Sequence, residues 1–198
     1  MQEDLKTELD VILGEISQNY CKNERYILTE SDLVNETYSC IRQSGILRKY
    51  GLSMHTEIRP YEPKKDKVIR NKDWEKLEQI NYAAKFDLVL VDDDEKYWKI
   101  TRTRIAQAQT GTDSKLKYWR FLLYPVESFR AVIEFKVRVK GNRKNIRKDI
   151  KKMKALHIKN NECLKYLVIL DRVAPKISVN SILDELKEED YIQKVIVN

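Results

Sequence analysis

The sequence contains few cysteines, glycines and prolines, which are abundant in disulfide-rich, fibrous and low-complexity proteins. Its 198 residues include three cysteines, five glycines and four prolines. Cys21, Cys40 and Cys163 are odd in number and far apart, which argues against a disulfide framework or a Cys-x-x-Cys zinc site. His55 and His157, the only histidines, have no second ligand at metal-binding spacing, so we expect structural or surface roles for them.

Long apolar runs are also lacking. No stretch approaches the roughly 18 apolar residues of a membrane-spanning helix. The first residues, MQEDLKTELD, are acidic and contain no apolar segment of the kind found in secretory signals. Hydrophobic residues make up 42% of the chain, which is enough for a core. We therefore expect a soluble, cytoplasmic, globular protein with no membrane partner.

Charge is abundant in the sequence and unevenly distributed. The formal net charge is +7, from 38 Lys and Arg against 31 Asp and Glu. Residues 1–40 carry three basic and nine acidic side chains, whereas residues 130–159 carry 12 basic and two acidic ones. Such a local excess favours a phosphate-bearing partner, and the alternative is a solvated helix face.

Hydrophobic periodicity predicts helices and strands along most of the chain. Helices are predicted at residues 3–20, from Thr29 or Ser31 to Gly45, at residues 143–158 and at residues 181–187. Strands are predicted at residues 52–59, 85–92, 97–105, 117–124, 130–139, 164–171 and 191–197, with Pro60 ending the first of them.

The order of these segments predicts a single α/β domain with a mixed sheet. A strand, a helix and a strand across residues 130–171 indicate a parallel pair of strands. The strands on either side of QAQTGTDS, which has turn composition, are expected to form a long hairpin. We therefore expect an N-terminal helical extension at residues 1–28 and a domain at residues 29–198, in which residues 93–129 are an insertion.

Two acidic residues lie within apolar strands, where an unpaired carboxylate is costly. Asp87 lies in KFDLVLV and Glu134 lies in AVIEFKV. Because side chains alternate along a strand, Glu134 and Lys136 share one face of theirs. Glu57, on the polar face of the first strand, offers a third carboxylate. The group is a candidate active site, and the alternative is an ordinary cross-strand salt bridge.

Carboxylates beside a lysine suit the hydrolysis of a phosphodiester bond. Carboxylate oxygens hold Mg²⁺, which prefers hard oxygen ligands and keeps several waters. The metal neutralises charge on the phosphate and lowers the pKa of a bound water. A nearby lysine can orient that water or stabilise the developing charge. A Glu-x-Lys triplet alone matches many sequences, so its context decides between the two interpretations.

The order of segments resembles the PD-(D/E)XK nuclease superfamily, which has the restriction-endonuclease-like fold. KFDLVLVDD resembles the strand that carries the aspartate of the family, and AVIEFKVRV resembles its (D/E)xK strand. DIKKMKAL and KYLVILDR resemble the helix and the strand that follow. The resemblance covers residues 30–172 and implies a three-layer core, in which helices flank a central mixed β-sheet.

The resemblance also implies a metal site and a division of roles. Asp87 and Glu134 would hold Mg²⁺ or Mn²⁺ together with the backbone carbonyl of Phe135. Asp87, Glu134 and Lys136 would be the catalytic residues, and Lys136 would position the attacking water. The enzyme would then be a metal-dependent nuclease, with DNA as the expected substrate.

A further acid often joins the site in this family. Glu57 fits this role from a strand and Glu36 fits it from the preceding helix, and strand alternation favours Glu57. The chain departs from the family pattern at two points. Phe86 stands in place of a proline before Asp87, and 46 residues separate Asp87 from Glu134, more than a short hairpin. The subfamily therefore stays open.

The basic residues that follow the Glu-x-Lys triplet are the expected contacts for nucleic-acid phosphates. They are Arg138, Lys140, Arg143, Lys144, Arg147, Lys148 and Lys151. Lys152 and Lys154 are expected to lie on the exposed side of the same helix. A catalytically inactive nucleic-acid-binding module and a protein-interaction subunit are the alternatives to a nuclease.

Two segments are candidate contacts for a homodimer or a partner protein. One is the apolar stripe of the N-terminal helix, made of Leu5, Leu9, Ile12 and Ile16, which can equally pack back onto its own domain. The other is the 93–129 insertion, whose two Tyr-Trp pairs, at Trp98 and Trp119, can stack on bases, complete a core or meet a partner.

Overall fold

The computed structural model describes residues 2–22, 29–61, 85–93, 123–137, 143–171, 184, 186–187 and 189–197. The helices are α1 (Gln2–Lys22), α2 (Glu30–Ser44), α3 (Ile46–Tyr50) and α6 (Arg143–Lys159), and η2 (Val126–Ser128) is a short 3-10 turn. The strands are β1 (Leu52–Tyr61), β2 (Phe86–Asp92), β3 (Leu123–Pro125), β4 (Phe129–Val137), β5 (Leu164–Leu170) and β6 (Ile192–Val197).

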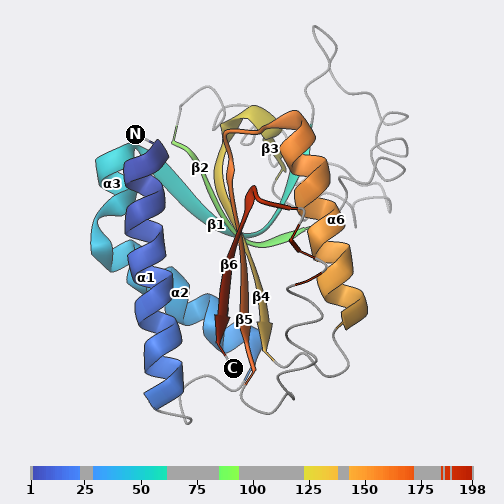
Figure 1. Ribbon diagram of the computed structural model, residues 1–198. Coiled ribbons are helices and arrows are strands. Elements are labelled where there is room, and N and C mark those ends of the chain that lie inside the picture. Colours follow the sequence, from blue (N-terminus) through green and yellow to red (C-terminus); the bar gives the residue numbers. More distant parts are fainter. Residues whose placement is uncertain are drawn as a thin grey trace, which may run out of the picture.

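The strands form one mixed sheet in the order β3-β1-β2-β4-β5-β6. β1 pairs antiparallel with β2, and β2 pairs antiparallel with β4. β4, β5 and β6 are parallel to one another, and the short β3 is parallel to β1. Figure 1 shows α1, α2 and α3 on one side of the sheet and α6 on the other. The prediction of an α/β fold with a mixed sheet flanked by helices is confirmed.

Each face of the sheet has its own apolar core. On one face, α1 and α2 pack against side chains that include Leu88 and Ile133. On the other face, α6 contributes Met153 to a core that contains Val89 and Val132. Neighbouring residues of β2 and β4 thus point to opposite faces, as strand alternation requires.

Helix α1 packs onto the first of these cores. Its apolar stripe, Leu5, Leu9, Ile12 and Ile16, is buried there. The Tyr166 hydroxyl on β5 donates a hydrogen bond of 2.9 Å to the Asp10 carboxylate on α1. Fully burying a leucine or isoleucine stabilises a protein by about 1.5–3 kcal/mol. The stripe is therefore covered by the chain's own sheet, and α1 belongs to the same core as the rest of the fold.

Helix α2 begins at one of its two candidate caps. The Thr29 hydroxyl accepts a hydrogen bond of 3.1 Å from the backbone N–H of Asp32, whose carboxylate accepts one of 2.8 Å from the Thr29 N–H. Such a cap contributes about 1 kcal/mol. Gly45 ends the helix at a φ of +82°, which glycine adopts without strain. The cap also places Glu30 in the first turn of α2.

Strand β1 continues past the proline that was predicted to end it. Its ladder with β2 runs from Leu52 to Ile58, and residues 59–61 pair with β3 instead. Pro60 thus lies beyond the ladder with β2, where its missing N–H removes no hydrogen bond to that strand. Leu123–Pro125, predicted to lie in or beside a hairpin, forms a parallel pair with β1.

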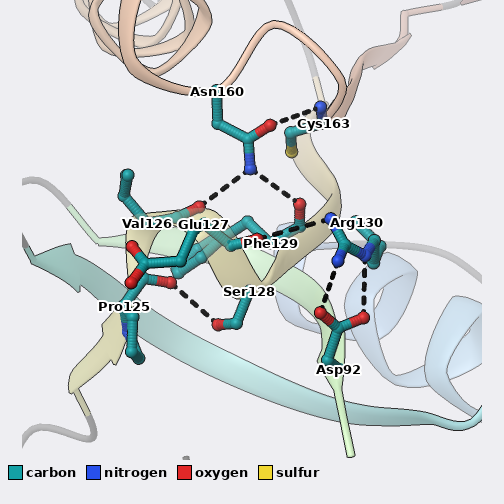
Figure 2. A network of polar contacts seen from close by, with 9 residues as sticks. All are labelled: Asp92, Pro125, Val126, Glu127, Ser128, Phe129, Arg130, Asn160 and Cys163. Atoms are coloured by element: carbon teal, nitrogen blue, oxygen red, sulfur yellow. Dashed lines mark hydrogen bonds and ion pairs between the residues drawn. The ribbon is translucent and has the colours of Figure 1, made fainter.

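Asn160, just beyond α6, fixes the start of β4 (Figure 2). Its side-chain amide donates to the carbonyls of Val126, at 2.8 Å, and Phe129, at 3.0 Å. Its side-chain oxygen accepts a 3.0 Å bond from the Cys163 N–H. One buried side chain therefore joins η2, β4 and the approach to β5, and it satisfies backbone groups that would otherwise be costly to bury.

Arg130 ties β4 to the end of β2 in the same region (Figure 2). Its guanidinium donates two hydrogen bonds to the Asp92 carboxylate, of 2.7 Å from Nε and 2.5 Å from Nη2. It also donates a bond of 3.3 Å to the Glu127 carbonyl. The geometry is the bidentate fork that suits arginine. We refer to these contacts of Asn160, Arg130 and Asp92 as the Asn160–Arg130 network.

Several predictions lie outside the described residues. They concern the hairpin apart from its last residues, with Trp98 and Trp119, and the beginning of the helix predicted at residues 181–187. Within the part of the chain that the structure describes, no helix is long and apolar enough to cross a membrane.

Candidate active site

Asp87 and Glu134 lie next to each other on the face of the sheet that α6 covers. In the ladder between β2 and β4, Leu88 is paired with Ile133 and Val89 with Val132. One further step along the two strands brings Asp87 opposite Glu134. The Asp87 carboxylate accepts a 2.9 Å hydrogen bond from the backbone N–H of the residue after Glu134. The two acids that the sequence singles out are therefore brought together.

Glu134 is buried and faces a lysine from α6. Only 1% of the residue is exposed. Lys152 Nζ lies 2.5 Å from Glu134 Oε1 and 3.1 Å from Asp149 Oδ1. The same ammonium donates a 2.6 Å hydrogen bond to the Lys85 carbonyl, and it lies 4.8 Å from the centre of the Phe86 ring. The ammonium is thus surrounded by three oxygens and one aromatic face.

Lys136 lies beside Glu134 on β4 and has acidic partners from two helices. Its ammonium donates a 2.6 Å hydrogen bond to the Phe135 carbonyl. It lies 3.1 Å from Asp149 Oδ2 on α6 and 3.6 Å from Glu30 Oε2 on α2. The two oxygens of Asp149 therefore face different lysines. We refer to Glu134, Lys136, Asp149 and Lys152 as the Glu134–Lys152 cluster.

The buried charges perturb one another. Burial raises the pKa of Glu134 well above its usual range, the attraction of Lys152 opposes that shift, and the charges of Asp87 and Asp149 add to it. Burial also disfavours the charged form of Lys136, but the surrounding carboxylates outweigh it, so the pKa of Lys136 is raised. Lys136 therefore stays an ammonium at neutral pH, whereas Glu134 needs a nearby cation to stay ionised.

The structure describes the side chain of only one of the two candidates for the third acid. Glu36 is exposed on α2, where its carboxylate is 3.9 Å from the Cys40 thiol. Glu57 lies in β1, and its side chain is outside the described residues. The acid from α2 that approaches Lys136 is Glu30, in the first turn of the helix.

Asp149 and Lys152 were missed as members of the site, and Lys152 was wrongly placed on the exposed side of its helix. Both side chains are largely buried, at 12% and 9% exposed. A signal for Asp149 is present in the sequence, because it is the only acidic residue of α6. It also follows Ile146 by three residues and precedes Met153 by four, which puts it on the buried stripe.

The outer side of α6 is basic. The predicted phosphate contacts on this helix are all exposed: Arg143, Lys144, Arg147, Lys148 and Lys151. We refer to these five residues as the basic face. Arg138 and Lys140 lie outside the described residues. One helix thus presents five cations to solvent while its inner side supplies Asp149 and Lys152 to the buried cluster.

The histidines lie in other contacts. His55 Nε2 is 2.9 Å from the Tyr124 hydroxyl, and burial lowers the pKa of His55. His157 stacks on Tyr191 with ring centres 4.0 Å apart. Neither histidine is paired with an acid or lysine of the Glu134–Lys152 cluster in these contacts.

The donors at the site fit a hard divalent cation in kind. They are the carboxylates of Asp87 and Glu134 and the carbonyl of Phe135, all oxygens of the type that Mg²⁺ prefers. Among the described residues, no group of three or more His, Cys, Asp or Glu side chains is placed to hold a metal ion. Mg²⁺ commonly binds through one or two carboxylates and keeps several waters, so the number of carboxylates here is one that it uses.

Comparison with known proteins assigns no family. No family model matches the chain, and the searches of curated proteins and of solved structures also find no match.

Proposed function

We propose that the chain is a metal-dependent nuclease of the PD-(D/E)XK type, with a restriction-endonuclease-like fold and DNA as the expected substrate. The observation that carries this proposal is the placement of Asp87 and Glu134 on one face of neighbouring strands, with Lys136 two residues further along β4. Each residue type has a role in phosphodiester hydrolysis, and the strand register brings them together across 46 residues of sequence.

Each side chain would have its own role in the reaction. Asp87 and Glu134, with the Phe135 carbonyl, would hold Mg²⁺ or Mn²⁺. Bound there, the metal would supply a water of lowered pKa and neutralise charge on the scissile phosphate. The Phe135 N–H fixes the orientation of the Asp87 carboxylate through its 2.9 Å bond. Lys136, whose charge is secured by its acidic neighbours, would orient the attacking water and stabilise negative charge that develops on the phosphate.

Asp149 would act as a positioning residue for Lys136. It holds the ammonium at 3.1 Å, and it comes from α6, the helix that also carries the basic face. The basic face would bind the backbone phosphates of the nucleic acid. Each phosphate contact neutralised on duplex DNA adds about −0.9 to the slope of log affinity against log salt. We therefore expect binding that weakens steeply with salt.

A non-catalytic nucleic-acid-binding module is the second candidate. It is favoured by the ion pairs of the Glu134–Lys152 cluster, because Lys152 and Lys136 already balance the buried acids without a metal. In that case the cluster would be structural and only the basic face would be functional. Tight, salt-dependent binding without cleavage under any divalent cation would support this candidate.

Cleavage assays separate the two candidates. Purified protein is incubated with plasmid DNA, DNA oligonucleotides or RNA in Mg²⁺, Mn²⁺ or EDTA, beside the variants Asp87→Asn and Lys136→Met. Glu127→Gln is the control, since it replaces an exposed carboxylate on η2. The proposal expects metal-dependent cleavage by the wild type and by the control, and loss of cleavage in both site variants. Cleavage that survives both site substitutions would rule out the assigned site.

A further inference from the structure

The ammonium of Lys152 has an unusual environment for a lysine on a helix that is otherwise rich in exposed cations. Its neighbours are a Glu134 oxygen at 2.5 Å, an Asp149 oxygen at 3.1 Å and the Lys85 carbonyl at 2.6 Å. Two carboxylate oxygens and a carbonyl oxygen are also the kinds of ligand that a hard divalent cation takes. The side chain is 9% exposed, so the ammonium is held within the fold.

We propose that Lys152 is a built-in counter-ion of Glu134, which a divalent cation must displace before it can bind. The proposal rests on the metal site of the proposed function and adds how that site is regulated. In the free protein, the Lys152 ammonium lies 2.5 Å from Glu134 Oε1 and occupies this carboxylate. The metal affinity is therefore set by a competition between the ammonium and the metal for one buried carboxylate.

The burial of Glu134 makes this competition strong. A carboxylate that is 1% exposed has lost its hydration, so a cation must lie close to it. An ammonium and a divalent ion on the same carboxylate would repel each other over a few ångströms, where screening by water is weak. Only one of the two cations is therefore expected to contact Glu134 at a time.

Other oxygen atoms lie close enough to bind the Lys152 ammonium when it moves away from Glu134. Asp149 is one turn away on the same helix and already lies 3.1 Å from the ammonium. The Lys85 carbonyl lies at 2.6 Å. The flexible four-carbon stem of lysine allows a small shift without movement of the helix. Displacement therefore exchanges one carboxylate for contacts that are already formed, rather than leaving an unpaired buried ammonium.

Metal binding without substrate tests the inference directly. The affinity for Mn²⁺ is measured by calorimetry or by electron paramagnetic resonance for the wild type, Lys152→Met and Lys154→Met. Lys154→Met is the matched control, because it removes an exposed lysine of the same helix that is paired with Glu189. We expect Lys152→Met to bind Mn²⁺ at least about tenfold more tightly than the wild type, and the control to be unchanged. Equal or weaker binding by Lys152→Met, or no Mn²⁺ binding by either protein, contradicts the inference.

Thermal unfolding of the same proteins gives a second readout. Without metal, Lys152→Met removes the ammonium that is paired with Glu134, so its melting temperature should fall. Saturating Mn²⁺ should recover most of the loss, because the metal replaces the missing cation. Lys154→Met should show no such metal-dependent recovery. A loss of stability in Lys152→Met that Mn²⁺ does not reduce speaks against the inference.

The wild type alone provides a third readout if Lys152→Met does not fold. Labelling with an amine-reactive reagent is followed residue by residue by mass spectrometry, with and without Mn²⁺. Lys152 should react slowly without the metal and faster with it, whereas the exposed Lys148 should react equally in both. Unchanged labelling of Lys152 at saturating Mn²⁺ contradicts displacement.

These outcomes separate the inference from the proposed function. If Mn²⁺ binding tightens in Lys152→Met but no nucleic acid is cleaved, the displacement stands and the nuclease proposal fails. If the wild type cleaves DNA but neither the affinity nor the labelling depends on Lys152, the nuclease proposal stands and the displacement fails.

Discussion

Two groups of polar side chains lie near the two ends of β4, and they differ in how well their polar atoms are satisfied. In the Asn160–Arg130 network, Asn160 makes three hydrogen bonds to backbone groups, and Arg130 meets both oxygens of Asp92 (Figure 2). In the Glu134–Lys152 cluster, ammonium groups lie close to the acids, yet Glu134 Oε1 and Asp149 Oδ2 have no hydrogen bond of ordinary geometry.

The difference indicates different roles. A network whose donors and acceptors are matched rigidifies the fold, and a ligand could bind there only by breaking bonds. Buried carboxylate oxygens with incomplete hydrogen bonding are costly, and they keep the capacity to bind a cation. Of the two groups, only the Glu134–Lys152 cluster includes buried carboxylates with this remaining capacity. We therefore expect substitutions in the two groups to affect different measurements.

The largest expected effect is on catalysis by Lys136. Lys136→Met removes the ammonium that is proposed to stabilise developing charge, while Asp149 keeps its contact with Lys152. We expect the single-turnover cleavage rate to fall by about 10²- to 10³-fold, the usual cost of removing one such group. The variant must first be shown to fold by circular dichroism. A rate close to that of the wild type would show that Lys136 has a structural role and not a catalytic one.

The next largest effect is on stability at Asn160. Asn160→Ala removes three buried hydrogen bonds to backbone groups, at about 1 kcal/mol each, so the free energy of unfolding in urea should fall by about 3 kcal/mol. The cleavage rate of the folded fraction should not change. Asn161→Ala is the control, because Asn161 is the exposed neighbour of Asn160, and it should leave the free energy of unfolding unaltered. Loss of cleavage without loss of stability would instead give Asn160 a role in catalysis, and it would contradict the structural role of this network.

A smaller effect is expected at the Arg130–Asp92 pair. Both side chains are about a quarter exposed, so solvent screens the interaction. A double-mutant cycle with Arg130→Met and Asp92→Asn should give a coupling energy of about 1 kcal/mol, which decreases at high salt. A coupling energy near zero would show that the fork is dispensable and that Asn160 alone holds this end of β4.

The smallest effect concerns pH and His55, which lies beside β3. Burial lowers the pKa of His55 in the folded state, so the unfolded chain takes up a proton first as the pH falls. The stability contributed by the neutral histidine is therefore present at pH 7 and is lost as the pH falls below about 6.5. His55→Asn should reduce this pH dependence. It should not abolish it, because burial also lowers the pKa of His157. An unchanged dependence of unfolding free energy on pH would contradict this assignment.

Much of the fold follows from local patterns in the sequence. Strand alternation in AVIEFKV placed Glu134 and Lys136 on one face, and apolar periodicity placed Met153 of α6 against the sheet. The pairing of Asp87 with Glu134 depends on the register between two strands that lie far apart in the chain. Local patterns do not specify such a register, so they single out both acids, and only the family resemblance implies that the two meet.

The inner side of α6 shows why the rest of the site was missed. Charged residues of a helix are usually exposed, so Lys152 was grouped with the other cations of this helix. Its burial depends on Glu134, which lies on a different element, and a helical pattern carries no information about that partner. Glu30 was missed for the same reason, because its contact with Lys136 depends on where the cap places the first turn of α2.

The proposed metal site is tested most directly by metal-dependent cleavage, measured for two proteins that differ only in one buried carboxyl group. Nicking of supercoiled plasmid is measured over a titration of Mn²⁺ for the wild type and Glu134→Gln, at equal folded fraction and with EDTA as the blank. We expect nicking by the wild type that saturates with Mn²⁺, and none above the blank for Glu134→Gln. Equal nicking by the two proteins, or nicking by neither, would contradict the proposed metal site.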